Sequence, residues 1–321
     1  MFALALFACA GEAPPAEIPA VSVAPVPTTV TVQLNWFPEP EFGGIYEAKE
    51  AGTYDKAALD VQILAGGAGT PVIQQVATGR STFGLTTADE VLLARAQGAD
   101  VVAVFATYQK HPACIMIHRK RGVTDLSELK GGTLALEDGI PFAQWLTKKF
   151  PFEGVTRVPY SGGVAGFLLD ENYAQQGYLT SEPILAKKQG ADPICLMVSE
   201  TGYNPYANVV ITSGAEIKDH ADVVKRFVES TQAGWDAYLA DGTRANAKIA
   251  TLNTAVDADA LHAMWDAQLM LVKGGAAEQG GVGVMEDARW TELAGQLLEI
   301  GAVATPVDAK GAFTNEFLPK H

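Results

Sequence analysis

Residues on which most enzymes depend are scarce in this chain. Five histidines and three cysteines occur among 321 residues, and no histidine pair has the H-E-x-x-H spacing of a zinc protease. The serine-hydrolase motif G-x-S-x-G and the phosphate-binding motif G-x-x-x-x-G-K-[ST] are missing as well. Gly281-Val282-Gly283 lacks the third glycine of a dinucleotide-binding loop. The sequence therefore predicts no catalytic residue, no metal site and no cofactor.

Positive charge and long apolar runs are also in short supply. Lysine and arginine together number 23 against 37 for aspartate and glutamate, a formal net charge of −14. This balance argues against nucleic acid or an anionic membrane surface as the main partner. No apolar run approaches the roughly 20 residues that span a bilayer. With 48% apolar and 19% charged residues, the composition is that of a well-packed globular protein, long enough for two domains.

The first residues of the chain are apolar and lead to a cysteine. The segment 1–8 reads M-F-A-L-A-L-F-A, and Cys9 is followed by the small residues Ala10 and Gly11. This pattern is similar to the end of a bacterial lipoprotein signal, with 6–9 as the lipobox and Cys9 as the lipidated residue. Phe7 is bulky for its position and no basic residue precedes the apolar segment, which a start codon placed too late would explain. The alternative is an unprocessed apolar N-terminus.

A proline-rich segment separates this signal from the rest of the chain. Residues 12–29 contain five prolines and no aromatic residue. Such a segment is typical of an extended, semi-rigid tether rather than of a folded core. We therefore assign 1–29 to a lipoprotein signal remnant and tether, and we expect the globular body to begin at Val30.

The two remaining cysteines lie in apolar, strand-like runs. Cys114 stands in A-C-I-M-I and Cys195 in P-I-C-L-M-V. Both are interpreted as buried, inert thiols, because free cysteine is among the most buried residue types. A disulfide between them is an open alternative, although their spacing does not favour it.

From Val30 onward, short apolar strands alternate with helices. Repeated βα units with glycine-containing connections are typical of mostly parallel sheets covered by helices on both faces. In the first series we expect strands at 30–34, 59–64, 81–85, 101–105 and 113–118, and helices at 70–78 and 87–96. In the second we expect strands at 133–137, 155–159, 175–179 and 194–198, and helices at 126–129, 142–150, 163–169 and 183–188.

A last strand at 208–212 returns to the first sheet, and the remainder is helical. Helices are expected at 219–240, 244–252, 257–271 and 286–300, with a flexible loop at 274–283. In the first of them, Val223, Phe227, Trp235 and Leu239 fit one apolar face. The sequence thus predicts an α/β clamshell with a helical C-terminal tail: lobe 1 comprises 30–118 plus 207–321, and lobe 2 comprises 119–206. A ligand is expected to lie between the lobes.

Six of the predicted strand ends direct loops toward this crevice. In open α/β sheets, ligands bind outside the carboxyl ends of the strands. The loops contain no lysine or arginine, although a bare sulfonate or phosphate usually recruits one. The loops are 35–36, 66–70, 86–87, 137–139, 160–163 and 180–183.

Aromatic residues in and near these loops are the sharper signal. Trp36 lies where Pro38 ends the first strand, and flat ligands are held by stacking against such rings. The alternative for Trp36 is a loop tryptophan that caps the core. Tyr160 and Tyr203 are further candidates for stacking, and Tyr46 is a candidate that also fits a core position of its helix.

The remaining candidates are polar residues and glycines that offer hydrogen bonds. Each serine and threonine among them fits a helix N-cap as well as a ligand contact. Glu182, at a helix start, is expected either to accept hydrogen bonds from an amino group on a ring or to complement the helix dipole. The other candidates are Asn35, Thr86, Thr87, Glu137, Ser161, Gly162 and Gly163.

Four segments resemble the periplasmic solute-binding proteins of ABC importers, in the branch that binds thiamine pyrimidines and is related to sulfonate and nitrate binders. The segments are L-N-W-F-P-E-P-E-F-G-G-I-Y-E-A-K-E-A-G, G-R-S-T-F-G-L-T-T-A, V-P-Y-S-G-G-V-A and Q-Q-G-Y-L-T-S-E-P. The resemblance implies a type II periplasmic-binding-protein fold that captures a solute and delivers it to a membrane permease. It also implies that Trp36 stacks on the ligand ring, that the loop 160–163 hydrogen-bonds the ring, and that Glu182 contacts an amino group.

One enzyme shares this fold family, the fungal pyrimidine synthase of thiamine biosynthesis, and it matches poorly. Its family has a lysine directly after the G-L pair and a histidine four residues on, where this chain has Thr86 and Glu90. Its cysteine-rich segment also has no counterpart here. The resemblance therefore favours binding over catalysis.

The resulting hypothesis is a monomeric, lipid-anchored, extracytoplasmic protein that presents a small ligand to an ABC permease in the inner membrane. A thiamine pyrimidine precursor, such as a hydroxymethyl- or formylaminomethyl-pyrimidine, is the first choice of ligand. Riboflavin or another vitamin-like ring is the second, and a solute of the sulfonate or nitrate type is a further alternative. The expected location is the periplasm or the cell surface, with membrane contact through the lipid anchor alone and no nucleic-acid partner.

Overall fold

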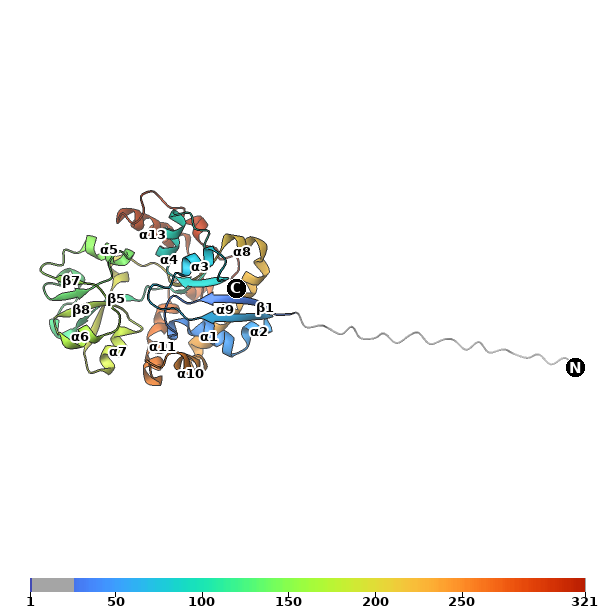
Figure 1. Cartoon of the computed structure of the whole chain (residues 1–321), viewed down its shortest axis with the longest axis horizontal. Coiled ribbons are helices and arrows are strands. Elements are labelled where there is room, and N and C mark those ends of the chain that lie inside the picture. Colours follow the sequence, from blue (N-terminus) through green and yellow to red (C-terminus); the bar gives the residue numbers. More distant parts are fainter. Residues whose placement is uncertain (2–25, 321) are drawn as a thin grey trace.

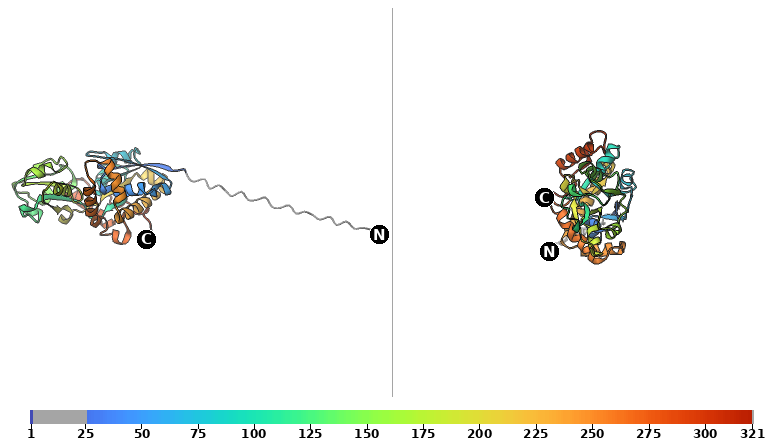
Figure 2. Two further views of the ribbon diagram at one scale, coloured as in Figure 1. Left: turned by 90° about the horizontal axis from the view of Figure 1, so that it is seen from below. Right: turned by 90° about the vertical axis from the view of Figure 1, so that its left-hand side faces the viewer.

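The chain folds into two α/β lobes that lie side by side (Figure 1). The computed structural model describes Met1 and residues 26–320. The predicted lipidation site Cys9 and most of the predicted tether lie outside these residues. Each lobe is built around a sheet of five strands. A view from below shows the same two bodies next to each other (Figure 2).

The sheet of lobe 1 has the strand order β2-β1-β3-β10-β4. Strand β1 pairs in parallel with β2 and β3, whereas β10 runs antiparallel to both β3 and β4. Four of the five strands therefore run in the same direction, which confirms the predicted mostly parallel sheet. Strand β10 is the exception, because it enters the sheet from the opposite direction as the chain returns from lobe 2. The strands are Thr28–Gln33, Leu59–Leu64, Phe83–Thr86, Val102–Tyr108 and Ala207–Thr212 for β1, β2, β3, β4 and β10.

Helices cover both faces of the lobe 1 sheet, and most of them come from the C-terminal part of the chain. Helix α1 packs against α9 so closely that a Cβ atom on Gly44 would lie 2.3 Å from the ring of Trp235. This contact explains why two glycines begin α1. The helices are α1 Gly43–Glu50, α2 Thr53–Lys56, α3 Val72–Ala77, α4 Ala88–Ala96, α8 Gly214–Asp219, α9 Ala221–Ala240, α10 Thr243–Leu252, α11 Ala258–Val272, α12 Ala277–Gly280 and α13 Asp287–Glu299.

The expected helical tail is present, with two local differences. The helix expected at 219–240 corresponds to α9, and an additional short helix, α8, precedes it. The expected flexible loop at 274–283 contains the short helix α12. Polar caps begin two of the tail helices, because the Asp257 side chain accepts from the Ala260 N–H and Ser213 accepts from the Glu216 N–H, both at 3.0 Å.

Lobe 2 has the strand order β7-β6-β8-β5-β9. Its strand β5 is antiparallel to β8 and β9, while β6 is parallel to β7 and β8. The sequence assigned 113–118 to lobe 1, and the pairing of β5 corrects this boundary to the segment 109–112. The elements are β5 Ala113–His118, β6 Thr133–Ala135, α5 Pro141–Lys149, β7 Thr156–Val158, α6 Ala165–Leu169, β8 Tyr173–Tyr178, α7 Glu182–Lys188 and β9 Pro193–Met197.

Cys114 and Cys195 form a disulfide bond, so the prediction of two free thiols was wrong. In the register of β5 and β9, Cys114 lies opposite Met197 and Cys195 lies opposite Met116. The two cysteines are thus diagonal neighbours on adjacent antiparallel strands, with their Cα atoms 5.3 Å apart. Their separation of 81 residues hides this proximity in the sequence.

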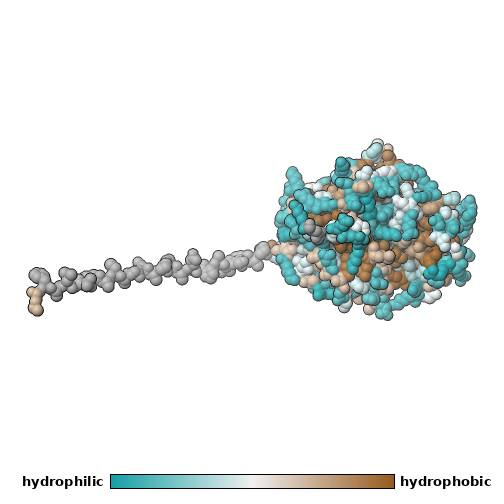
Figure 3. Space-filling view, turned by 180° about the vertical axis from the view of Figure 1, so that it is seen from behind, coloured by the Kyte–Doolittle hydropathy of each residue, from teal (hydrophilic) through white to brown (hydrophobic). Residues whose placement is uncertain are grey.

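Two hydrophobic cores lie on opposite faces of the lobe 1 sheet. One includes Phe83 and Phe227, whose stacked rings have centroids 3.9 Å apart. The other continues into lobe 2 through Ile115 and Tyr203. Among the described residues, none of the helices combines the length and the apolar character needed to cross a membrane. On the face drawn in Figure 3, hydrophilic residues predominate and hydrophobic residues gather in smaller groups.

Candidate functional site

A hydrogen bond joins the two lobes beside the start of α7. The Ser181 hydroxyl, in lobe 2, donates to a carboxylate oxygen of Glu39, in lobe 1, at 3.3 Å. Glu39 has an extended backbone and is flanked by Pro38 and Pro40. Proline biases the preceding residue toward an extended conformation, so Pro40 accounts for the extended backbone of Glu39.

Glu182, the first residue of α7, connects two of the loops predicted to face the ligand. One of its carboxylate oxygens accepts a hydrogen bond from the Tyr160 hydroxyl, and the other accepts from the Tyr178 N–H, both at 2.7 Å. Tyr160 and Glu182 are therefore brought together as the sequence predicted for neighbouring loops. Both carboxylate oxygens have a partner, which fixes the orientation of the side chain.

Carboxylates from both lobes act on one another at this junction. Burial and the neighbouring Glu182 raise the pKa of Glu39 to about 7, while the hydrogen bond from Ser181 lowers it. Burial, then Glu39 and Glu182, hold the pKa of Glu41 well above its ordinary value. Burial and the carboxylates of Glu182, Glu39 and Glu137 also raise the pKa of Tyr160. A buried excess of carboxylates favours a ligand that presents hydrogen-bond donors or positive charge.

Sequence reasoning missed Glu39 and Glu41. The signal was available in the run W-F-P-E-P-E-F, where two carboxylates alternate with prolines directly after a strand. An acidic loop is usually solvated, and only the approach of Glu182 from lobe 2 gives these residues a role at the junction.

A second set of carboxylates lies at the start of α4. The hydroxyls of Thr86 and Thr87 donate to the carboxylates of Glu90 and Asp89, respectively. The Tyr203 hydroxyl donates to Asp89 at 2.7 Å, and Tyr203 has no exposed surface. Thr86, Thr87 and Tyr203 are thus arranged around carboxylates of lobe 1, and their predicted ligand contacts stay predictions.

Tyr178 interacts with both sets of carboxylates. Burial raises its pKa, and the carboxylates of Glu41, Asp89, Glu90 and Glu182 raise it further. Glu41, Asp89 and Glu90 belong to lobe 1, whereas Glu182 belongs to lobe 2. Carboxylates of both lobes therefore act electrostatically on the tyrosine of β8.

Trp36 is half-buried and packs against the core of lobe 1. Its ring is perpendicular to that of Phe37, with centroids 5.4 Å apart, and its carbonyl accepts from the Gly66 N–H at 3.0 Å. Two predicted strand-end loops, 35–36 and 66–70, thus meet. The side-chain oxygen of Asn35, the residue before Trp36, is buried and has no hydrogen-bond partner, which leaves it an unused acceptor. Stacking of a ligand on Trp36 stays a prediction.

Other predicted site residues have varied surroundings. Tyr46 is 3% exposed and packs in the core of lobe 1, so the structure gives it a packing role. Glu137 is exposed, and its N–H donates to the Gln176 side chain at 2.7 Å. Ser161 is exposed, and Gly162 and Gly163 have φ angles of 81° and 68°. The Gly163 carbonyl accepts from Gln175 at 2.8 Å, which anchors this loop to β8.

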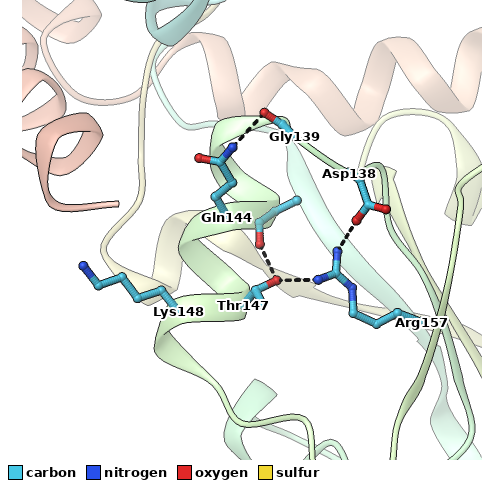
Figure 4. Close-up of a pocket in the computed structure, with 7 residues that line it drawn as sticks. Asp138, Gly139, Gln144, Thr147, Lys148 and Arg157 are labelled. Carbon is cyan, nitrogen blue, oxygen red and sulfur yellow. Dashed lines mark hydrogen bonds and ion pairs between the residues drawn. The ribbon is translucent and has the colours of Figure 1, made fainter. Parts of the chain in front are cut away.

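Two surface pockets lie away from Glu39 and Glu182, and the lining of the first includes Asp138 and Gly139 of the predicted loop 137–139. One, of about 330 Å³, lies beside α5 in lobe 2, where Arg157 donates to Asp138 at 2.7 Å and to Thr147 at 3.1 Å (Figure 4). The other, of about 360 Å³, lies between β9 and the end of α11 and includes Cys195 and Met270 in its lining. Within the described part of the chain, no group of three or more histidine, cysteine, aspartate or glutamate residues is placed to hold a metal ion.

Two curated relatives of this chain are named as binding proteins. The chain is 25% identical over 345 residues to the riboflavin-binding protein RibY of Chloroflexus aurantiacus, covering 98% of this chain and 95% of the relative. It is also 25% identical over 224 residues to the formylaminopyrimidine-binding protein of Halalkalibacterium halodurans, covering 65% and 66% of the two chains.

Solved structures share the fold at low sequence identity. The periplasmic aliphatic sulphonate binding protein SsuA from Escherichia coli superposes with a TM-score of 0.69 at 14% identity, covering 92% of this chain and 94% of SsuA. The desulfurization enzyme DszB superposes with a TM-score of 0.62 at 15% identity, covering 90% and 97%. The expected periplasmic-binding-protein fold is thus confirmed.

A family model provides the assignment. The model described as NMT1/THI5 like matches residues 39–245, which include Glu39, the whole of lobe 2 and the start of the helical tail. The chain belongs to the NMT1/THI5-like family.

Proposed function

We propose that this protein is the extracytoplasmic substrate-binding component of an ABC importer, and that it encloses a small, flat heteroaromatic solute between its lobes. The observation that supports the proposal most directly is the contact of Ser181 with Glu39 across the lobes, beside Glu182. Both relatives described above are named as binding proteins for ring compounds. The protein would hand its solute to a permease in the inner membrane and act as a monomer.

The charge of the lobe junction supports a ligand rich in hydrogen-bond donors. The charged groups that raise the pKa of Glu39 and Glu41 are other carboxylates. An anion such as a sulfonate or nitrate would be repelled there, because like charges in a site of low dielectric interact strongly. A ring with an amino group, as in a thiamine pyrimidine precursor, would instead donate to these carboxylates. This makes an aminopyrimidine the first choice of ligand.

Riboflavin is the second candidate. Similarity to the riboflavin-binding relative covers 98% of this chain, whereas similarity to the formylaminopyrimidine-binding relative covers 65%. The ribityl hydroxyls and the ring N–H of riboflavin would also donate to carboxylates. In both cases the proposal assigns stacking to Trp36 and hydrogen bonding to Glu182 and to the loop 160–163.

The location outside the cytoplasm is supported by the disulfide. Disulfides persist in oxidising compartments and are rare in the cytosol. The bond between Cys114 and Cys195 therefore fits an exported protein. Lipidation at Cys9 is proposed as the means of retention at the membrane.

Calorimetric titration tests the function. The purified chain is titrated with hydroxymethylpyrimidine, formylaminomethyl-pyrimidine, riboflavin, ethanesulfonate and nitrate, and each mixture is then analysed by chromatography. We expect saturable binding of one ring compound at unchanged chemical composition and no binding of ethanesulfonate or nitrate. Conversion of the bound compound would support an enzyme instead. Binding of ethanesulfonate alone would contradict the proposed ligand class.

A further inference from the structure

The chain crosses between the lobes twice, and one arginine contacts both crossings. The first crossing, 109–112, joins β4 to β5, and the second, 198–206, joins β9 to β10. Arg289 of α13 donates to the carbonyl of Gln109 at 2.5 Å in the first crossing. It donates to the carbonyls of Asn204 and Pro205 at 2.7 and 3.1 Å in the second. Its guanidinium also lies 3.8 Å from the ring centroid of Tyr206. Because α13 packs on lobe 1, these carbonyls are held to lobe 1.

In each crossing, the hydrogen bonds to lobe 1 end at one particular residue. In the first, the Lys110 N–H donates to the Leu271 carbonyl of α11 at 3.2 Å. In the second, the Gly202 carbonyl accepts from the Gln296 side chain of α13 at 2.8 Å. Tyr203, next along the chain, donates to Asp89 of α4. Lys110 is therefore the last residue of the first crossing that bonds to lobe 1, and Gly202 is the first residue of the second crossing that does so.

Contacts with lobe 2 begin at the residues next to Lys110 and Gly202. The His111 ring lies against Phe142 of α5 and Tyr178 of β8, with centroids 6.3 and 6.0 Å away. The next carbonyl, of Pro112, accepts from the Leu179 N–H at 2.9 Å. In the second crossing, the Thr201 hydroxyl accepts from the Trp145 indole at 2.9 Å, and the Thr201 carbonyl accepts from the Lys149 ammonium.

We infer that the lobes rotate about two short chain segments, Lys110–His111 and Thr201–Gly202, and that Arg289 confines the motion to them by holding both crossings to lobe 1. Residues on either side of each segment bond to opposite lobes, so a change in lobe orientation must be absorbed between them. Gly202 has a φ of 95°, a region open to glycine and strained for other residues. The His111 N–H donates to the Asn204 side chain at 2.8 Å, which couples the two pivots.

Removal of the arginine tests the first half of the inference. Hydrogen exchange is compared for the full-length wild type, Arg289→Gln and the control Arg226→Gln. Arg226 also donates to two backbone carbonyls, those of Ala57 and Ala58 at 2.9 and 3.0 Å, but within lobe 1. We expect exchange to be about tenfold faster at 108–113 and 201–206 in Arg289→Gln only. Unchanged exchange there, or an equal increase in the control, would show that Arg289 does not hold the hinge.

If Arg289→Gln does not fold, Arg289→Lys provides the same comparison, because lysine keeps the charge but cannot bond three carbonyls in one plane. The exchange rate of Arg289→Lys at the two crossings should then lie between the rate of the wild type and the rate of an unstructured segment. Exchange identical to the wild type in a folded Arg289→Lys would overturn the role given to the guanidinium fork.

The glycine pivot is tested by a pair of matched substitutions. Gly202 and Gly98 have φ angles of 95° and 87°, and an added Cβ would meet no atom closer than 3.8 Å at either position. Gly98 lies after α4, away from the crossings. Both Gly202→Ala and Gly98→Ala should lower the melting temperature, because alanine is strained at these φ values.

Only Gly202→Ala should shift the distance between spin labels placed on the two lobes at the exposed positions Leu169 and Leu252. The labels are attached through cysteine substitutions in a Cys9→Ser background, in which Cys114 and Cys195 are occupied by their disulfide. An unshifted distance in Gly202→Ala, or an equal shift in Gly98→Ala, would place the pivot elsewhere. The measurement needs no ligand, so its failure would leave the proposed binding function standing, and the reverse also holds.

Discussion

The hydroxyl of Ser181 lies 3.3 Å from a carboxylate oxygen of Glu39, and this hydrogen bond joins lobe 2 to lobe 1. The next residue, Glu182, adds a second carboxylate that bonds Tyr160 and the backbone of Tyr178. Closure of the lobes therefore brings carboxylates of opposite lobes together. Their mutual repulsion is relieved by a proton or by a ligand that donates hydrogen bonds, and this relationship underlies two of the four predictions below, those for Glu182 and Glu39.

Trp36→Ala should weaken binding of the ring compound by about 1–3 kcal/mol with little change in melting temperature. The indole is half-buried at the edge of the lobe 1 core, so its loss removes ligand contact rather than central packing. Titration calorimetry and thermal unfolding measure the two effects. Trp235→Ala is the control, because Trp235 has no exposed surface and its truncation should cost about 3–5 kcal/mol of stability. A comparable stability loss in Trp36→Ala would make Trp36 a core residue.

Glu182→Gln should lower affinity for an aminopyrimidine by about 1.5–3 kcal/mol, the range for hydrogen bonds to charged groups. Tyr160→Phe is the matched control, since it removes the hydroxyl that bonds Glu182 and leaves the carboxylate in place. We expect a smaller loss in Tyr160→Phe. The affinities are measured with an aminopyrimidine and with its hydroxyl analogue. Equal losses for both ligands and both variants would mean that Glu182 only orients Tyr160.

The stability of the protein should respond to the protonation of Glu39. Burial and Glu182 raise its pKa from the ordinary 4.5 to about 7, so the folded protein binds a proton that the unfolded chain releases. The contribution of Glu39 to stability is thus fully present below pH 4.5 and is lost as the pH rises through 7. Ser181, Glu41, Glu182 and Tyr160 are the groups that act with Glu39 at this junction.

Melting temperatures from pH 5 to 8 for wild type and Glu39→Gln measure this contribution. The variant should gain stability relative to wild type as the pH rises. Burial and Arg289 lower the pKa of His111 to about 3, which gives the opposite slope between pH 6.5 and 3, but both proteins share this residue. Their difference therefore reports the titration of Glu39 together with that of Glu41, whose pKa Glu39 raises. A difference that stays constant over this pH range would contradict the assignment.

Loss of the disulfide should destabilise lobe 2. The bond closes a loop with a sequence separation of 81 residues. Chain-entropy arguments give about 4.5 kcal/mol for such a crosslink, and disulfides typically contribute about 2–4 kcal/mol. The measurement is urea unfolding of the wild type with and without reductant, and of Cys114→Ala with Cys195→Ala. Reductant should lower the unfolding midpoint of the wild type and leave that of the double variant unchanged. Equal midpoints for all samples would show that the cysteines are not bonded in solution.

Much of the fold could be predicted from local patterns. The strand predicted at 59–64 is β2, and the strand predicted at 113–118 is β5. Pro141 begins α5 as predicted, because proline is preorganised for the first turn of a helix. The direction of β10 was not predictable from its own residues, since it depends on the path by which the chain returns from lobe 2.

The candidate site could be predicted from the sequence only in part. Tyr160 and Glu182 were found because each follows a predicted strand, and the structure joins them by a hydrogen bond. Glu39 and Glu41 were missed, since nothing in an acidic loop indicates that a carboxylate of the other lobe will approach it. Tyr46 shows the converse: its position beside a site loop suggested a ligand contact, and its helix turns it into the core.

The sequence by itself determined the order of strands and helices, the two-lobed plan and the kind of family to which the chain belongs. These follow from hydrophobic periodicity, from proline and glycine at the ends of elements and from short motifs, all of which act over a few residues. Only the tertiary structure decided the direction of β10, the pairing of Cys114 with Cys195, the approach of Glu39 to Glu182 and the hold of Arg289 on both crossings. Each of these depends on residues that are distant in the chain and become neighbours only when the two sheets have formed and met.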